Sequence, residues 1–244
     1  MSDVTLKLDW CSHEAAKYAV EKWHYSHTMP KSKLAKIGAW ENGVFIGCVI
    51  FGVGATADLV KSYGLIPTQG CELVRVALNK HVSATSKIVS IALKMIKREY
   101  KGLRLVVSFA DPEQSHVGTI YQAMGWIFTG VSAASDEYLV NGKRWHGRAF
   151  RASMPSHLTT KQALLQMDAN YQIVKGTSKY RYLYPLDDAM RAQIAPLSKP
   201  YPKRSDPMRL SSSSKTAIDQ IENSGANPTQ TLNTPSANTH EISF

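Results

Sequence analysis

Apolar and polar positions alternate with two different periods over the first 150 residues of the chain. Residues 4–8 alternate strictly, which predicts a strand, and residues 15–23 repeat apolar side chains at helical spacing behind Ser12, a residue type preferred at N-caps. The same reading predicts strands at 37–40, 44–53, 72–78, 103–109 and 126–129, and helices around 88–96 and at 118–124. This order predicts an α/β fold, a single domain with a mixed central sheet and flanking helices.

Two segments near the C-terminus differ from this pattern. Residues 179–204 are basic and aromatic and contain four prolines, so we expect residues 179–202 to form a docking arm rather than a core element. From Ser211 onward the chain is rich in Ser, Thr, Asn and Pro, and it cannot bury enough surface to offset the entropy of ordering. We therefore expect one domain over residues 1–202, arm included, and a disordered tail over residues 203–244.

Of all features of the composition, the net charge says most about a binding partner. The 244 residues include 29 Lys and Arg against 19 Asp and Glu, a formal net charge of +10. From Lys203 onward four basic residues balance four acidic ones, so the whole excess lies in residues 1–202. A basic body with five Trp and most of the eleven Tyr suits a polyanion such as nucleic acid. The alternative is that the charge serves only solubility.

Composition also excludes several classes of protein. A hydrophobic content of 43% excludes a wholly disordered chain. The longest mostly apolar run, residues 44–55, is too short and too rich in glycine to cross a membrane. No secretory leader is visible, so we expect a cytoplasmic protein. Three widely spaced cysteines give neither a zinc pattern nor a disulfide framework.

Several motifs carry a resemblance to known families. The strand at 72–78, followed by a loop and a long helix, resembles the central strand of the GNAT acyltransferases, and Tyr121-Gln-Ala-Met-Gly125-Trp126 resembles a GNAT ending whose Tyr commonly acts as a general acid. Four segments together resemble the phage Mom family, the DNA modification proteins of Mu-like phages: WHYSHTMP (23–30), CELVRVAL (71–78), SFADPEQSHVGTIYQAMGW (108–126) and RYLYPLDD (181–188). The likeness runs from about Val4 to Lys203.

This resemblance implies a GNAT-like transferase that converts adenine in DNA to N6-carbamoylmethyladenine and so protects phage DNA from restriction in the host cytoplasm. The exocyclic amino group is the donor by which adenine is recognised in the major groove, so substituting it blocks readout by an endonuclease. Chemistry on that group requires a flipped or single-stranded base, which aromatic side chains and a basic surface can capture.

Three residues are candidates for catalysis. Asp111 follows a buried strand and precedes Pro112. It could act as a general base or contact the amino group of the adenine, and the alternative is a turn or a helix cap. Ser108 lies on the same strand, where the alternative is a buried hydroxyl bonded to backbone. The resemblance makes Tyr121 a general acid, and the alternative is a core aromatic residue.

Five further residues are candidates for substrate binding. His24 and Tyr25 end the first predicted helix and would lie beside the base, although a His at a helix C-terminus is also favoured by the dipole alone. With Asp111 and His116 they could form a metal site, an alternative rather than our prediction. Glu72 and Arg75 are an odd number of positions apart, so on a regular strand they point to opposite faces and at most one faces the cleft.

The donor site is the least defined part of the sequence. GNAT enzymes that use acetyl-CoA usually carry a glycine-rich loop before the long helix, but residues 79–87 contain no glycine. A helix N-terminus capped by Ser83, Thr85 or Ser86, with Lys80 and Lys87 nearby, could still hold a phosphate. The donor is therefore either acetyl-CoA or glycyl-tRNA, with tRNA as a possible second partner beside DNA. Two other functions stay open, a non-catalytic DNA-binding module and a conventional GNAT N-acetyltransferase.

Overall fold

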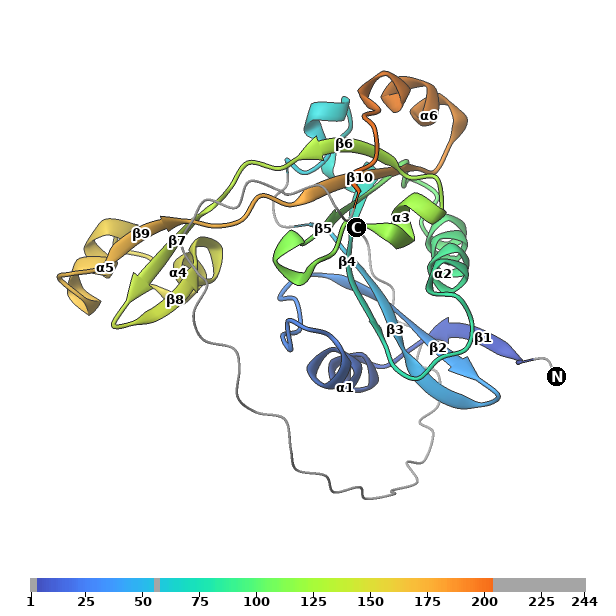
Figure 1. Cartoon of the computed structure of the whole chain (residues 1–244), viewed down its shortest axis with the longest axis horizontal. Helices are drawn as coiled ribbons and strands as arrows, with labels where there is room; N and C mark the ends of the chain where they lie inside the picture. Colours follow the sequence, from blue (N-terminus) through green and yellow to red (C-terminus); the bar gives the residue numbers. More distant parts are fainter. Residues whose placement is uncertain (1–3, 55–57, 204–244) are drawn as a thin grey trace.

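A computed structural model describes residues 4–54 and 58–203 of the chain (Figure 1). Seven strands form the main sheet in the order β1-β2-β3-β4-β5-β10-β6. Their bounds are Leu6–Trp10 (β1), Leu34–Glu41 (β2), Val44–Gly52 (β3), Gly70–Leu78 (β4), Leu105–Ala110 (β5), Ile127–Val131 (β6) and Tyr180–Pro185 (β10). Neighbours run antiparallel except β4 and β5, which are parallel, so the predicted mixed central sheet is confirmed.

Helices cover both faces of this sheet. Their bounds are His13–Trp23 (α1), Thr85–Glu99 (α2), Thr119–Ala123 (α3) and Asp188–Ile194 (α6). The apolar stripe of α2 and Tyr121 of α3 pack into one hydrophobic cluster, whereas α1 packs into a second cluster with residues of β3 and β4. The strands and helices predicted up to residue 129 are all confirmed, with ends that differ by a few residues. Asn42 and Gly43 form the predicted hairpin turn, both with positive φ (50° and 82°).

The strand β10 corrects the prediction for the C-terminal arm. It lies between β5 and β6 inside the main sheet, so its segment is a core element. Tyr182 and Leu183 are fully buried, and Asp187 then caps α6. The prediction was wrong because tyrosines and a strand-ending proline indicate an exposed arm by composition, while their aromatic rings bury as well as leucines do.

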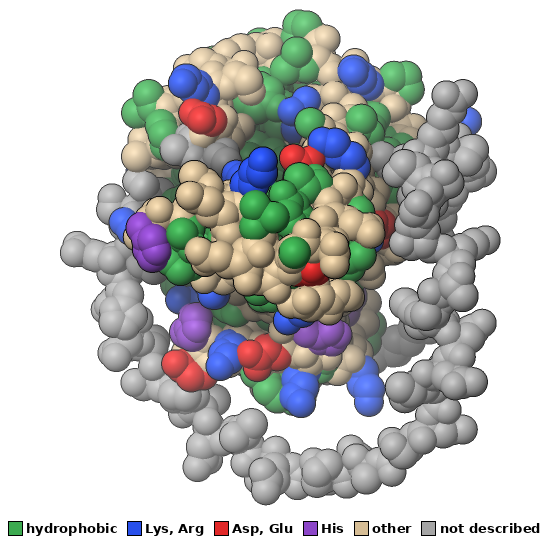
Figure 2. Space-filling model, turned by 90° about the vertical axis from the view of Figure 1, so that its left-hand side faces the viewer, with side chains coloured by type: hydrophobic (Ala, Val, Ile, Leu, Met, Phe, Trp, Pro, Cys, Tyr) green, Lys and Arg blue, Asp and Glu red, His purple; other side chains and the backbone are tan. Residues whose placement is uncertain are grey.

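A small lobe, for which we predicted no elements, lies between β6 and β10. It consists of β7 (Asp136–Val140), β8 (Lys143–His146), β9 (Gln172–Lys175), α4 (Gly147–Ser153) and α5 (Thr160–Met167). Its three strands form a separate sheet, and Tyr138, Phe150 and Leu164 belong to its own buried cluster. The lobe extends away from the main sheet in Figure 1, and Lys and Arg side chains are spread over the face that Figure 2 shows. The two segments that join the lobe to β6 and β10 form its neck. They are held together where the Ser132 N–H donates to the Lys179 carbonyl (2.8 Å).

Two irregularities of β4 shape the site. It pairs with β5 only over Gly70–Glu72, after which the two parallel strands separate. Its register against β3 then shifts by one residue at Val74, which is a β-bulge. Cys71 and Leu73 before the bulge pack on the α2 face, as do Val76 and Leu78 after it. The alternation of side chains between the two faces of the sheet therefore changes phase at Val74.

Two expectations concern the membrane and the tail. Within the described residues, no helix has the length and apolarity needed to cross a bilayer. The predicted disordered tail lies outside the described residues from position 204 onward.

Candidate functional site

Five predicted residues lie in one cluster at the carboxyl ends of β4 and β5. The ring of Tyr25 lies 4.3 Å from that of His24 and 5.7 Å from that of His116, measured between centroids. Arg75 and Asp111 both act electrostatically on Tyr25, which places them beside it. Crevices at the carboxyl ends of parallel strands are the usual ligand sites of α/β sheets. We call these five residues and Lys179 the strand-end cluster.

Asp111 has two roles in this cluster. Its Oδ1 accepts a hydrogen bond from the Glu113 N–H (3.1 Å) and caps a short 3-10 helix, which confirms the cap that we weighed as an alternative. Its Oδ2 lies 3.0 Å from Lys179 Nζ, and the carboxyl side chain is only 11% exposed. One oxygen thus fixes the orientation of the carboxylate, while the other forms an ion pair with Lys179, whose side chain is 41% exposed.

Lys179 was missed by the sequence analysis. It directly precedes β10, and its N–H donates to the Ser132 hydroxyl (3.0 Å) at the neck of the lobe. Because β10 pairs with β5, the residue before Tyr180 comes next to the residue after Ala110. Only the pairing of β5 with β10 brings these two charges together, and no local sequence signal predicts that pairing.

His24 is held neutral. Burial lowers its pKa to about 4, and the nearby charges of Arg75, His116 and His27 add to this effect. The Ser26 N–H donates to His24 Nδ1 (3.1 Å), so the proton of the neutral ring is on Nε2. The alternative of a favourable helix-dipole contact requires a protonated His24, and this pKa excludes it near pH 7.

Arg75 and Glu72 correct a second prediction. The bulge at Val74 places both residues on the α1 face, so they do not point to opposite sides of the strand. Arg75 donates to the carbonyls of Val74 (2.7 Å) and Thr28 (3.3 Å), while its Nε is buried and has no hydrogen-bond partner among the described residues. A buried donor without a partner costs free energy, which a substrate oxygen could offset. Glu72 lies close enough to raise the pKa of Arg75, although burial lowers it overall.

Ser108 and Tyr121 lie deeper, where β4 and β5 separate. Ser108 Oγ donates to the Leu73 carbonyl (2.9 Å) and is hydrogen bonded to the Tyr121 hydroxyl (2.7 Å). Burial raises the pKa of Tyr121 to about 12, against the opposing effect of Ser108. This geometry fits the alternatives of a backbone-bonded serine and a core tyrosine, and the catalytic roles of the two residues stay predictions.

The loop before α2 is organised by an unexpected residue. The Glu41 carboxylate accepts from the N–H groups of Val82 (2.8 Å) and Ser83 (2.6 Å). Burial alone would raise the pKa of Glu41, but these hydrogen bonds outweigh it and lower the pKa below its usual value. Ala84 is the N-cap and makes no side-chain cap, so the expectation that Ser83, Thr85 or Ser86 caps this helix was wrong. The Thr85 hydroxyl instead lies 3.5 Å from His81 Nε2.

The described residues as arranged fit neither the diphosphate of coenzyme A nor a metal ion. Two backbone N–H groups that could hold a diphosphate already bind Glu41, so the loop does not fit a CoA diphosphate as it stands. The roles of Lys80, Ser86 and Lys87 stay predictions. No three His, Cys, Asp or Glu side chains of the described residues are arranged to hold a metal ion, so the donor set of His24, Tyr25, Asp111 and His116 does not fit one.

Comparisons with known proteins give a family. A model of the Mom protein family matches residues 5–203. The methylcarbamoylase mom of Escherichia phage Mu is 25% identical over 205 residues, which cover 81% of this chain and 84% of that protein.

Two solved structures share a distant similarity. FeeM, an N-acyl amino acid synthase from uncultured soil microbes, is 10% identical with a TM-score of 0.44, over 79% of this chain and 97% of that one. A putative acetyltransferase of Acinetobacter baylyi is 12% identical with a TM-score of 0.42, over 77% and 95%. Such TM-scores are too low to transfer a site or a ligand. The family match spans the described residues from β1 to Lys203, and the chain therefore belongs to the Mom protein family.

Proposed function

We propose that this protein modifies adenine in DNA at its exocyclic amino group, giving N6-carbamoylmethyladenine. The observation that carries the proposal is the strand-end cluster, which combines a neutral His24, a buried Asp111 carboxylate and an unpaired Arg75 Nε. Membership of the Mom family and the similarity to a methylcarbamoylase support it. In the host cytoplasm, the modified base would escape recognition by restriction endonucleases.

The residues of the cluster divide the work on a flipped base. Tyr25 is 43% exposed and stacks on His24, so the pair offers a surface on which a base can stack. The Asp111 carboxylate accepts the proton of the amino group as its nitrogen forms the new bond, and the ion pair with Lys179 keeps that carboxylate in position. His24 donates through Nε2 to an acceptor of the base or of the donor, and Arg75 Nε binds a developing oxyanion.

The donor that we propose is an activated glycyl group carried on tRNA. Glu41 supports an alternative to acetyl-CoA, because a diphosphate at the α2 loop would have to displace a hydrogen-bonded carboxylate. In the first step the adenine amino nitrogen attacks the glycyl ester and the tRNA hydroxyl leaves. The glycyl amine then attacks adenine carbon 6 through a five-membered ring, and the original nitrogen leaves carbon 6 to become the carboxamide. All atoms balance without an oxidant or a reductant.

A labelled donor tests this route. Purified protein, unlabelled DNA and tRNA charged with ¹⁵N-glycine should give a nucleoside with the label on the nitrogen attached to the ring, and the carboxamide should stay unlabelled. Efficient modification from acetyl-CoA in the absence of tRNA would contradict the donor, while leaving the adenine product in place.

The function itself is tested by mass spectrometry of nucleosides from plasmid DNA of expressing cells. A heavier deoxyadenosine is expected. Unmodified DNA together with tight DNA binding would favour the non-catalytic binding module, and an acetylated small molecule or protein would favour a conventional N-acetyltransferase.

A further inference from the structure

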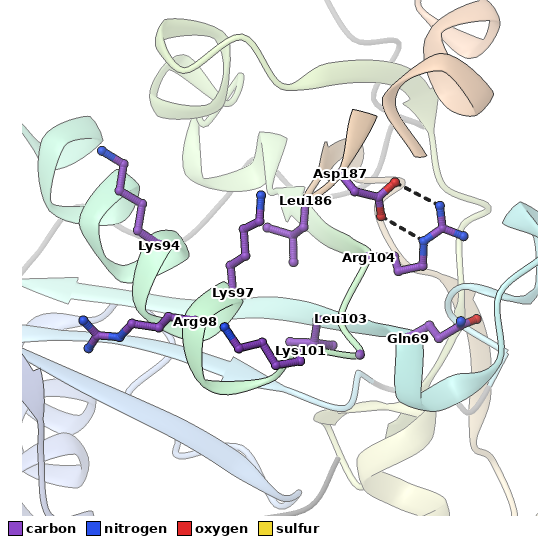
Figure 3. Close-up of a pocket in the computed structure, with 10 residues that line it drawn as sticks. Gln69, Lys94, Lys97, Arg98, Lys101, Leu103, Arg104, Leu186 and Asp187 are labelled. Atoms are coloured by element: carbon purple, nitrogen blue, oxygen red, sulfur yellow. Dashed lines mark hydrogen bonds and ion pairs between the residues drawn. The ribbon is translucent and has the colours of Figure 1, made fainter. Parts of the chain in front are cut away.

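A second charged region lies at the amino ends of β4 and β5, away from the strand-end cluster. A cavity of about 710 Å³ opens there between the C-terminal half of α2, the starts of the two strands and the turn after β10. Figure 3 shows its lining, in which Leu103 and Leu186 are the buried apolar residues. Five of its ten lining residues are Lys or Arg, and one is acidic.

Four of the cations lie at the C-terminal end of α2. Lys94, Lys97 and Arg98 are spaced as i, i+3 and i+4 on one side of the helix, and Lys101 lies in the turn directly after its C-cap. At the rise of an α-helix the three helical cations span about 6 Å. All four are exposed, and none of them lies within ion-pair distance of a carboxylate of the described residues. We call them the α2 cationic stripe.

The single acid of the cavity is already engaged. Arg104 donates to both oxygens of Asp187 (2.8 and 2.9 Å), and the Met190 N–H donates to the same carboxylate (2.7 Å). The Arg104 hydrogen bonds lower the pKa of Asp187 to about 2, against the opposing effect of desolvation. Asp187 therefore anchors the wall of the cavity through Arg104. Of the stripe residues, Lys97 adds the smallest of the electrostatic effects on Asp187, and none forms an ion pair with it.

The location separates this region from the substrate cluster. Arg75 and His24 are on the α1 face at the carboxyl ends of the strands, whereas the stripe is on the α2 face at their amino ends. The six residues of β5 alone span about 20 Å. The stripe is therefore a second region, separate from the one that holds the adenine at the strand-end cluster.

We propose that the α2 cationic stripe binds the phosphodiester backbone of a DNA segment other than the one that presents the adenine. A row of exposed Lys and Arg without ion-pair partners suits consecutive phosphates of one strand, and exposed cations without base-reading partners bind backbone regardless of sequence. The inference rests on the proposed function only in that the partner is DNA. The segment is a stretch of the bound DNA away from the target adenine, because DNA is the substrate that the proposed function requires.

A matched pair of variants tests the stripe in the full chain. The test variant is Lys94→Gln/Lys97→Gln/Lys101→Gln, in which glutamine keeps helix propensity. The control is Lys7→Gln/Lys17→Gln/Lys61→Gln, whose lysines are exposed and already paired with carboxylates elsewhere on the surface. Both variants lose the same charge, and thermal melts should match the parent. Binding of a 30-base-pair duplex and of unfractionated tRNA is measured against salt concentration, without donor.

The expected result is a salt dependence that flattens only in the test variant. The slope of log K against log salt should fall by about 2 to 3 for the nucleic acid that contacts all three lysines, since each lost phosphate contact removes roughly 0.7 to 0.9. A change with the duplex supports the proposal, whereas a change with tRNA alone would overturn it and assign the stripe to RNA. Equal slopes for test and control variants on both ligands would overturn the proposal. Because no turnover is measured, this outcome is independent of whether the protein modifies adenine.

Discussion

The two ends of the parallel strands β4 and β5 carry charge in opposite ways. At the carboxyl end, the buried Asp111 carboxylate forms an ion pair with Lys179 beside a buried, neutral His24. At the amino end, the α2 cationic stripe is exposed and lacks ion-pair partners among the described residues. Burial shifts pKa values and fixes side chains in place, whereas exposed charge attracts a polyanion and is screened by salt. We therefore assign chemistry to the first end and backbone binding to the second.

The largest effect on DNA modification is expected from Asp111→Asn, at the carboxyl ends of β4 and β5. Asparagine keeps an oxygen that can cap the 3-10 helix, but it removes the basic carboxylate, so modification should fall at least 100-fold while the protein stays folded. The measurement is the fraction of modified deoxyadenosine in plasmid DNA, with the thermal melt as a check on folding.

The control for this change is Asp9→Asn, which removes an exposed carboxylate paired with Lys7 and should leave modification unchanged. If Asp111→Asn modifies DNA as well as the parent does, Asp111 has no part in the mechanism and the assignment of chemistry to this end is wrong.

The second prediction uses the pH dependence of stability. Because the pKa of His24 is about 4 in the folded protein and near 6.5 when exposed, the unfolded state binds more protons between these values. Stability from this residue is complete above pH 6.5 and is lost as pH falls towards 4, by on the order of 3 kcal/mol. Urea unfolding across this range should show the loss in the parent and a much smaller one in His24→Gln.

An exposed histidine on the same helix provides the comparison. His13→Gln should retain the pH dependence of the parent, because His13 lies on the solvent side of α1. Equal curves for His24→Gln and the parent would mean that His24 is not held neutral by its surroundings.

The sequence predicted the elements well where each has a strong pattern of its own. The helix α2 was found from its apolar stripe, and β3 from a long apolar run. The strand β10 was missed because its tyrosines and proline resemble an exposed arm by composition, and the elements of the small lobe were missed because they are stabilised by a buried cluster of their own more than by local pattern. One extra residue at Val74 was also invisible, since a bulge changes the facing of a strand without changing its composition.

The candidate site was predicted in part for a similar reason. His24, Tyr25 and Asp111 follow the ends of buried elements, and such positions gather at one edge of a sheet. Lys179 and Glu41 could not be found this way. Each acts on a partner about 40 to 70 positions away in the chain, through a strand pairing or a loop contact that only the folded structure defines.

A third prediction concerns the start of the helix α2. Glu41→Ala removes the charged acceptor of two part-buried N–H groups there, so the free energy of unfolding should fall by about 1 to 3 kcal/mol. The same change frees these groups for an anion, and the variant should bind coenzyme A or inorganic pyrophosphate more tightly than the parent in calorimetry.

The matched control for this change is Glu14→Ala, which removes an exposed carboxylate in the first turn of α1 and should not alter binding of either anion. Tight binding of coenzyme A by the parent, with no gain in Glu41→Ala, would show that Glu41 does not compete with the diphosphate. The argument for a donor other than acetyl-CoA would then lose its support at this loop.

The smallest effect is expected from deleting residues 211–244. The family match ends at residue 203, and the deleted segment carries one lysine against three acidic residues, so it adds no basic charge to either end of the strands. Modification of plasmid DNA should be unchanged, and the salt dependence of DNA binding should keep its slope, because no phosphate contact is lost. Affinity should stay equal or rise slightly, since the deletion removes a net negative charge from a protein that binds a polyanion. A lower slope in the deletion variant would mean that the tail contacts phosphates, and part of the binding assigned to the α2 cationic stripe would then belong to the tail.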